Sequence, residues 1–107
     1  MTSEDKLRLY LCENGYNILD EEMVEDKGRV YAVIAVSFDG VKREYTPAEL
    51  LLGKKNIEKG TELFVKQLDR RINRTKQTID ERKSGGFDCA EFEELLREMQ
   101  NIKKRTI

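Results

Sequence analysis

Histidine is absent from the 107 residues, and cysteine occurs only at Cys12 and Cys89. Two thiols without histidine form neither a zinc site nor a disulfide framework, so we interpret both cysteines as small hydrophobic residues in a reducing compartment. No stretch approaches the roughly 18–20 apolar residues that a membrane span needs. The acidic N-terminus also lacks the basic and then apolar layout of a signal peptide. The prediction is therefore a cytoplasmic protein with no membrane partner and no metal site.

Catalytic signatures are missing as well. There is no glycine-rich nucleotide loop and no nucleophile beside a base, and Gly85-Gly86 is interpreted as a turn because it follows no predicted strand. Three carboxylates stand in a row at Asp20, Glu21 and Glu22. Strand alternation sends Glu21 to one face and its two neighbours to the other. Since nothing nearby supplies another kind of ligand, we interpret the cluster as a solvated strand end. No catalytic, cofactor-binding or metal-binding residue is predicted.

Charge is abundant and unevenly distributed. Charged residues make up 38% of the chain, which favours exposed helix or coiled coil, yet the net charge is only −1. Residues 1–53 carry six basic and eleven acidic side chains, whereas residues 54–86 carry ten basic and five acidic ones. A positive segment is therefore hidden inside a nearly neutral total.

A predicted β-hairpin occupies the middle of the chain. Two strand-like runs flank Asp26-Lys27-Gly28, whose glycine can adopt the positive φ of a tight hairpin loop. The second run, Val30–Val36, has no polar residue across seven positions, which is typical of a strand covered on both faces. Two strands alone are only marginally stable in water. The hypothesis is that this segment is the last portion of a larger α/β fold, separated from the rest of its sheet.

Two short helices are predicted on either side of this hairpin. Residues 3–14 have acidic residues in their first turn and end before Gly15, with an apolar stripe assigned to Leu7, Tyr10 and Leu11. The sequence Thr46-Pro47-Ala48-Glu49 predicts a capped helix over 47–52. Gly53 ends that helix, and a polar connection is expected from there to Gly60.

Two longer helices are predicted after Thr61. Apolar residues recur at heptad spacing until Ser84-Gly85-Gly86 breaks the first helix, and Asp88 with Glu91 then forms a capping pair for the second. The seam positions in the first helix are Val65, Leu68, Ile72, Thr75 and Ile79. Those in the second are Phe92, Leu95, Met99 and Ile102. Two such helices joined by a glycine turn predict an antiparallel helical hairpin or coiled coil.

The basic segment is the only feature of the sequence that suggests a function. Lys66, Arg70 and Arg74 recur at i, i+4 and i+8, so they share one helical stripe away from the seam. Such a stripe suits contact with nucleic-acid phosphates. A solvated coiled-coil face is the alternative, since no aromatic residues are interleaved for base stacking. The candidate RNA-binding residues are Lys54, Lys55, Lys59, Lys66, Arg70, Arg71 and Arg74.

Two stretches together resemble a known family. ENGYNILDEEMVEDKGRVYAVIAV, followed by EYTPAELLLGKKN and a long charged helix, resembles the C-terminal part of the bacterial tRNA adenine-N1 methyltransferases that modify adenine-22. The likeness covers roughly residues 4–85. It depends on the hairpin and on three short motifs, which are Glu13-Asn14-Gly15-Tyr16, Asp20-Glu21-Glu22 and Glu49-Leu50-Leu51-Leu52-Gly53.

The resemblance implies an architecture. In that family a Rossmann-like N-terminal half binds S-adenosylmethionine, and a helical extension that follows its final strand pair is considered to help grip tRNA. Residues 16–25 and 30–38 would be the last two strands of the sheet, with the final one antiparallel and inserted. The expected organisation is a piece of the methyltransferase domain over 1–45, a connecting helix and basic linker over 46–60, and a helical extension over 61–107.

The sequence therefore predicts an α+β fragment made of a short helix, an antiparallel β-hairpin and an antiparallel helical hairpin. By the resemblance it is the C-terminal portion of an S-adenosylmethionine-dependent tRNA methyltransferase, binds no cofactor in this chain and is not catalytic by itself. Its expected partners are tRNA and either a separate N-terminal half or a second copy. The alternative is a small non-enzymatic protein that interacts through its helices or adds its strands to a partner's sheet.

Overall fold

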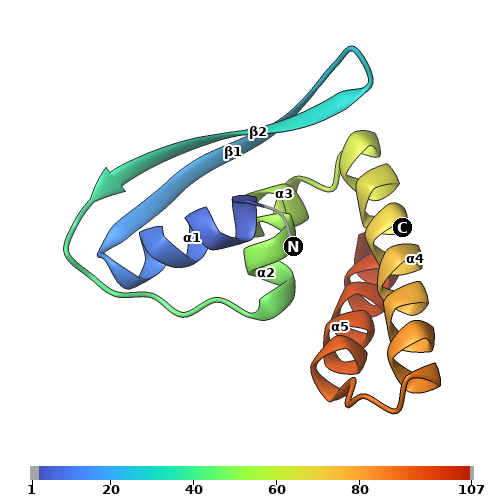
Figure 1. Cartoon of the computed structure of the whole chain (residues 1–107). Coiled ribbons are helices and arrows are strands. Elements are labelled where there is room, and N and C mark those ends of the chain that lie inside the picture. The colour runs from blue at the N-terminus through green and yellow to red at the C-terminus, as the bar shows by residue number, and fades with distance from the viewer. Residues whose placement is uncertain (1–2, 107) are drawn as a thin grey trace. The chain divides into compact units, whose positions relative to one another are not determined.

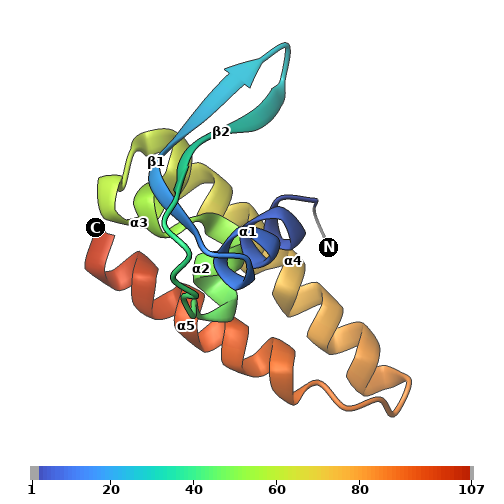
Figure 2. The ribbon, with the colours of Figure 1, turned by 90° about the vertical axis from the view of Figure 1, so that its left-hand side faces the viewer.

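The computed structural model describes residues 3–106 and divides the chain into two compact units that meet between Lys59 and Gly60. Both units are seen in Figures 1 and 2. The first contains α1 (Ser3–Glu13), β1 (Tyr16–Asp26), β2 (Arg29–Phe38), α2 (Pro47–Leu52) and α3 (Lys54–Lys59). The second contains α4 (Glu62–Ser84) and α5 (Ala90–Thr106). None of the helices within the described residues is long and apolar enough to cross a membrane.

The predicted hairpin is confirmed. β1 and β2 pair antiparallel from Tyr16 opposite Phe38 to Asp26 opposite Arg29, and they form a two-stranded sheet within residues 3–106. The loop between them consists of Lys27 and Gly28, with φ of 50° and 78°. Positive φ at both central residues is what a two-residue hairpin loop needs to match the twist of its strands. The loop end of the hairpin projects beyond the helices of its own unit (Figure 1).

The two faces of the hairpin are in different environments. A β-bulge between Ile18 and Asp20 shifts the alternation, so that Ile18 and Glu21 share a face, and both are buried. On the opposite face Tyr31 is 48% exposed and Val33 is 56% exposed. The apolar run of β2 is only partly covered even on the Glu21 side, where Ile34 is half-buried and Val36 is 41% exposed. The first unit does not supply the cover on both faces that such a run is expected to have.

The predicted capping of α2 is confirmed, whereas the predicted Asp88–Glu91 pair is wrong, because α5 begins at Ala90 and Asp88 Oδ1 accepts from the Ala90 amide at 3.1 Å. Thr46 and Glu49 form the expected capping box, since Thr46 Oγ1 accepts from the Glu49 amide at 3.2 Å and Glu49 Oε1 accepts from the Thr46 amide at 2.9 Å. Gly15 follows the end of α1 with φ of 80°, and a Cβ there would lie 2.7 Å from the Cα of Gly40. This close approach fixes the loop after β2 against the C-terminal end of α1, where the Arg43 amide donates to the Cys12 carbonyl at 3.1 Å.

Two expectations about the first unit were wrong. Residues Lys54–Lys59 form α3 instead of an irregular polar connection. In α1, Leu7 and Tyr10 are exposed, and the buried stripe consists of Arg8, Leu11 and Cys12. The stripe is displaced because the side of α1 that faces β1 and α2 accommodates an arginine whose charge is paired there.

The helical hairpin is confirmed with a correction to its seam. α4 and α5 lie side by side (Figures 1 and 2) and run antiparallel, since ion pairs join Asp69 to Lys103 and Lys83 to Glu93. Val65 is only half-buried, and the position before it, Phe64, is buried instead. The buried residues of α4 are Phe64, Leu68, Ile72, Thr75 and Ile79.

Candidate functional site

The carboxylate cluster of β1 contains a buried ion pair. Arg8 Nε lies 2.7 Å from Glu21 Oε1, and the two side chains are 1% and 0% exposed. Arg8 Nη1 also donates to the carbonyl oxygens of Leu50 at 2.9 Å and Leu51 at 3.1 Å. A buried charge requires both an opposite charge and hydrogen bonds, and Arg8 has both. The interpretation of Glu21 as a solvated residue is therefore wrong.

Gly53 completes this cluster. Its φ is 92°, and a Cβ on it would lie 2.6 Å from Glu21 Oε2 and 2.8 Å from Arg8 Nη2. The Lys55 amide, in the first turn of α3, donates to Glu21 Oε2 at 3.3 Å. Thus the motif around Asp20-Glu21-Glu22 and the motif that ends in Gly53 meet in space around the Arg8 guanidinium.

The neighbours of Glu21 are on the outer face, as alternation predicted. Glu22 is exposed, and Asp20 Oδ1 lies 2.8 Å from Lys59 Nζ, which also donates to the Glu21 carbonyl at 2.5 Å. The hydrogen bond from Lys59 lowers the pKa of the Asp20 carboxyl below its ordinary value. Within residues 3–106, no three His, Cys, Asp or Glu side chains gather as a metal-ligand group. The cluster connects α1, β1, α2 and α3, and its role is structural.

Sequence reasoning missed Arg8 because charged residues are rarely buried unless they are paired. One signal was present: Arg8, Leu11 and Cys12 have i, i+3, i+4 spacing, so an arginine lies on a face with two apolar residues. The acidic partner could not be identified from spacing alone, because the bulge near Leu19 decides which face of β1 Glu21 occupies.

The candidate RNA-binding residues are divided between the two units. In the first unit, Lys54 lies over the Tyr45 ring at 5.9 Å, Lys55 pairs with Glu58 at 3.7 Å, and Lys59 pairs with Asp20. The other four are on α4, where Arg71 is half-buried and Lys66, Arg70 and Arg74 are exposed. The three exposed residues of α4 therefore differ from the three lysines of the first unit, each of which contacts another side chain. Whether any of these residues contacts RNA stays a prediction.

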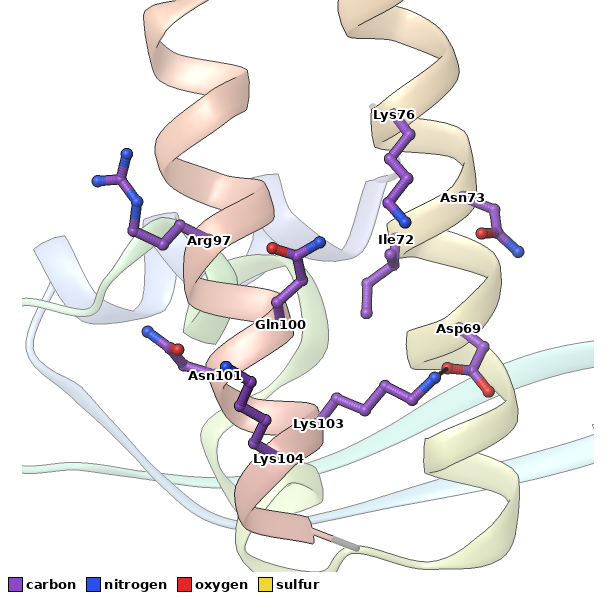
Figure 3. A pocket seen from close by; sticks show the side chains of 9 residues that line it. All are labelled: Asp69, Ile72, Asn73, Lys76, Arg97, Gln100, Asn101, Lys103 and Lys104. Atoms are coloured by element: carbon purple, nitrogen blue, oxygen red, sulfur yellow. Dashed lines mark ion pairs between the residues drawn. The ribbon is translucent and has the colours of Figure 1, made fainter.

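The second unit also has a groove between its two helices, which sequence reasoning did not identify (Figure 3). Most of the side chains that line it are polar or basic. One ion pair crosses the groove, with Lys103 Nζ of α5 2.6 Å from Asp69 Oδ1 of α4. Arg97 was not singled out as a candidate, because it stands among the acidic residues of the first half of α5.

A cofactor crevice of the Rossmann kind does not fit the residues present. Such a crevice forms outside the carboxyl ends of neighbouring parallel strands, next to a glycine-rich turn that leads into a helix. The sheet within residues 3–106 has two antiparallel strands, and β2 is followed by an irregular segment over 39–46.

The fold defines a class, the Rossmann-like methyltransferases, of which this chain matches one part. Streptococcus pneumoniae Sp1610, a candidate tRNA (m1A22) methyltransferase solved with S-adenosyl-L-methionine, matches with a TM-score of 0.71 at 17% identity over 95% of this chain. The family profile described as tRNA (adenine(22)-N(1))-methyltransferase matches residues 1–104. The chain belongs to that family.

Two further solved structures show the same fold. The B. subtilis m1A22 tRNA methyltransferase TrmK matches with a TM-score of 0.64 at 22% identity over 96% of this chain. A protein of the NADB-Rossmann superfamily from Streptococcus agalactiae matches with a TM-score of 0.74 at 21% identity over 94% of this chain. No curated protein matches.

This chain spans less than half the length of these solved relatives. It covers 44% of the S. pneumoniae chain, 47% of the B. subtilis chain and 43% of the S. agalactiae chain. The identification as part of a larger methyltransferase fold, made from the apolar run of β2 and the family motifs, is thus confirmed. The remainder of that fold has no counterpart in these 107 residues.

Proposed function

We propose that this chain serves as the C-terminal portion of an S-adenosylmethionine-dependent tRNA adenine-N1 methyltransferase and is not catalytic by itself. Its hairpin would complete the sheet of a cofactor-binding half, and α4 and α5 would form an arm that contacts tRNA. The observation that carries the proposal is the exposed apolar face of β2 in a chain that covers less than half of its solved relatives.

Two properties of β2 support a sheet-completing role. Tyr31 and Val33 expose apolar surface on a face where a packed sheet would have helices. The edge of β2 that faces away from β1 pairs with no other strand among residues 3–106, so its backbone groups are free to extend a sheet. A cofactor-binding half would account for both properties, because one of its strands would pair with the free edge of β2 and its helices would cover the exposed face.

The charge of α4 supports an RNA-contacting arm. Lys66, Arg70 and Arg74 are exposed at i, i+4 and i+8, and each would neutralise a backbone phosphate without reading sequence. Replacing the three with glutamine should weaken tRNA binding and make log K depend less steeply on log salt. Unchanged tRNA binding would show that this stripe is only a solvated helix face.

The central experiment measures transfer of a labelled methyl group from S-adenosylmethionine to tRNA. The chain is assayed alone and mixed with a cofactor-binding half encoded in the same genome, and a tRNA without adenine at position 22 serves as the control. We expect methylation of the adenine-22 substrate only by the mixture. Methyl transfer by the purified 107 residues would overturn the proposal that they are not catalytic.

The alternative is a non-enzymatic protein that adds its strands to a partner's sheet. The same mixing experiment distinguishes it from the methyltransferase role. If the cofactor-binding half neither co-migrates with the chain in size-exclusion chromatography nor gains activity from it, the sheet-completing role fails. The alternative would then be the better explanation of the exposed β2 face.

A further inference from the structure

The groove between α4 and α5 has a regular composition. On α4 its lining residues are Asp69, Ile72, Asn73 and Lys76, at i, i+3, i+4 and i+7. On α5 the residues Arg97, Gln100, Asn101 and Lys104 repeat the same spacing, with Lys103 beside them. This spacing gathers each set on one side of its helix. The groove therefore lies where two polar helix faces meet, and Ile72 is the single apolar residue that lines it.

The charges of the groove are mostly positive. Its lining contains Lys76, Arg97, Lys103 and Lys104 against one carboxylate, Asp69. Lys103 pairs with Asp69 across the groove, which neutralises that carboxylate and ties the helices together (Figure 3). Among residues 3–106, Lys76 and Lys104 form no ion pair, so their full charge is presented to a ligand.

Arg97 lies one helical turn after Glu93 on α5. The pKa of Glu93 is lowered by the Cys89 thiol, by Lys83 and, to a smaller extent, by Arg97. In Figure 3 the Arg97 side chain points to the outer side of α5, whereas Lys76 and Gln100 point toward one another between the helices. Lys76 is therefore the cation between the helices, and Lys104 and Arg97 extend the positive surface along α5.

The side chains of this groove match a sugar–phosphate backbone. Lysine and arginine supply charge-assisted hydrogen bonds to phosphate oxygens, and the amides of Asn73, Gln100 and Asn101 can donate to phosphate or exchange hydrogen bonds with ribose hydroxyls. No aromatic side chain lines the groove, so it offers no platform for base stacking. The chemistry favours the backbone of RNA over its bases.

We propose that the groove between α4 and α5, through Lys76, Lys104 and Arg97, binds the phosphate backbone of the RNA on which this family acts. This inference rests on the proposed function, and it adds a second surface to the arm. The stripe of Lys66, Arg70 and Arg74 lies outside the groove lining. The two surfaces can be altered separately, since they share no residue.

The test measures binding of a tRNA transcript to the 107-residue chain by fluorescence anisotropy at several salt concentrations. The groove variant carries K76Q, R97Q and K104Q, and the stripe variant carries K66Q, R70Q and R74Q. A third variant with K27Q, R29Q and K42Q removes the same number of charges from the first unit. Far-UV circular dichroism of each variant checks that its helices are retained.

We expect the groove variant to bind tRNA at least about tenfold more weakly, with a salt slope shallower by about two. The third variant should lose less than about threefold, because it tests only the change of net charge. A groove variant that binds like the third variant would overturn this inference. If the stripe variant is then the weakened one, the tRNA-contacting arm survives without the groove. If the unaltered chain binds no tRNA, the arm and the groove are both wrong.

Discussion

At the scale of single residues, Gly53 decides whether α2 and α3 can approach β1. A side chain there would meet both Glu21 Oε2, at 2.6 Å, and Arg8 Nη2, at 2.8 Å. The two side chains form a buried ion pair and cannot move aside without losing hydrogen bonds. The glycine is therefore required by close approach as well as by its φ of 92°.

Replacing Gly53 with alanine should destabilise the first unit by about 2–4 kcal/mol, from the positive φ and the collision together. Gly28 is the matched control, because it has φ of 78° in the same unit but nothing within 4 Å of an added Cβ. Gly28→Ala should cost only about 1 kcal/mol. Urea denaturation followed by circular dichroism measures both. Equal losses for the two variants would show that the collision at Gly53 is relieved.

The ion pair of Arg8 and Glu21 should behave as a coupled unit. Arg8→Met leaves the Glu21 carboxylate buried without its cation, which should cost about 3–5 kcal/mol. The double variant Arg8→Met, Glu21→Leu should recover much of that loss, because neither charge is then buried alone. Lys59→Met, which breaks the exposed pair with Asp20, should cost much less than Arg8→Met, because solvent screens an exposed ion pair. The same denaturation series tests this order, and a double variant worse than Arg8→Met would contradict it.

At the scale of elements, the sequence was sufficient wherever the deciding contacts are local. The capping box at Thr46, the two-residue hairpin loop and the end of α4 before Gly85 all depend on residues within about four positions of one another. α3 was missed because Lys54–Lys59 has no apolar periodicity. In its first turn the Lys55 amide donates to Glu21 Oε2, and Glu21 is 34 residues away in the sequence.

The buried faces of helices were harder to predict than the helices themselves. Leu7 and Tyr10 were expected in the core instead of Arg8, and Val65 was expected instead of Phe64. In α1 the buried stripe is shifted by about one position, whereas in α4 the error is confined to one residue, since Leu68, Ile72, Thr75 and Ile79 are buried as predicted. Which face is buried depends on the neighbouring element, and a local pattern with apolar residues on adjacent positions does not specify it. The ion pair and the groove were missed for the same reason, since both depend on contacts between elements.

The two faces of the hairpin should respond differently to charge. Val33→Lys, on the exposed face, should change the free energy of unfolding by no more than about 0.5 kcal/mol. Ile18→Lys, on the buried face, should destabilise the first unit by about 3 kcal/mol or more, because it buries a charge without a partner. In binding to a cofactor-binding half, Val33→Lys should nevertheless weaken affinity about tenfold or more. A Val33→Lys chain that binds normally would show that this face stays open in the complex.

At the scale of the whole molecule, the exposed β2 face and its free edge are expected to control association. Tyr31 and Val33 expose apolar side chains next to backbone groups that no other strand in residues 3–106 pairs with. Surfaces of this kind are prone to strand pairing between molecules. We therefore expect the purified chain to self-associate as its concentration rises, which sedimentation velocity measures directly.

Adding a cofactor-binding half should replace this self-association with a one-to-one complex, because the same face and edge cannot serve both partners. The variant Tyr31→Lys, Val33→Lys should stay monomeric at concentrations where the unaltered chain associates, since like charges on paired strands repel. It should also fail to form the one-to-one complex. If that variant self-associates like the unaltered chain, association occurs through another surface, and the helical arm would be the next to test by the groove and stripe variants.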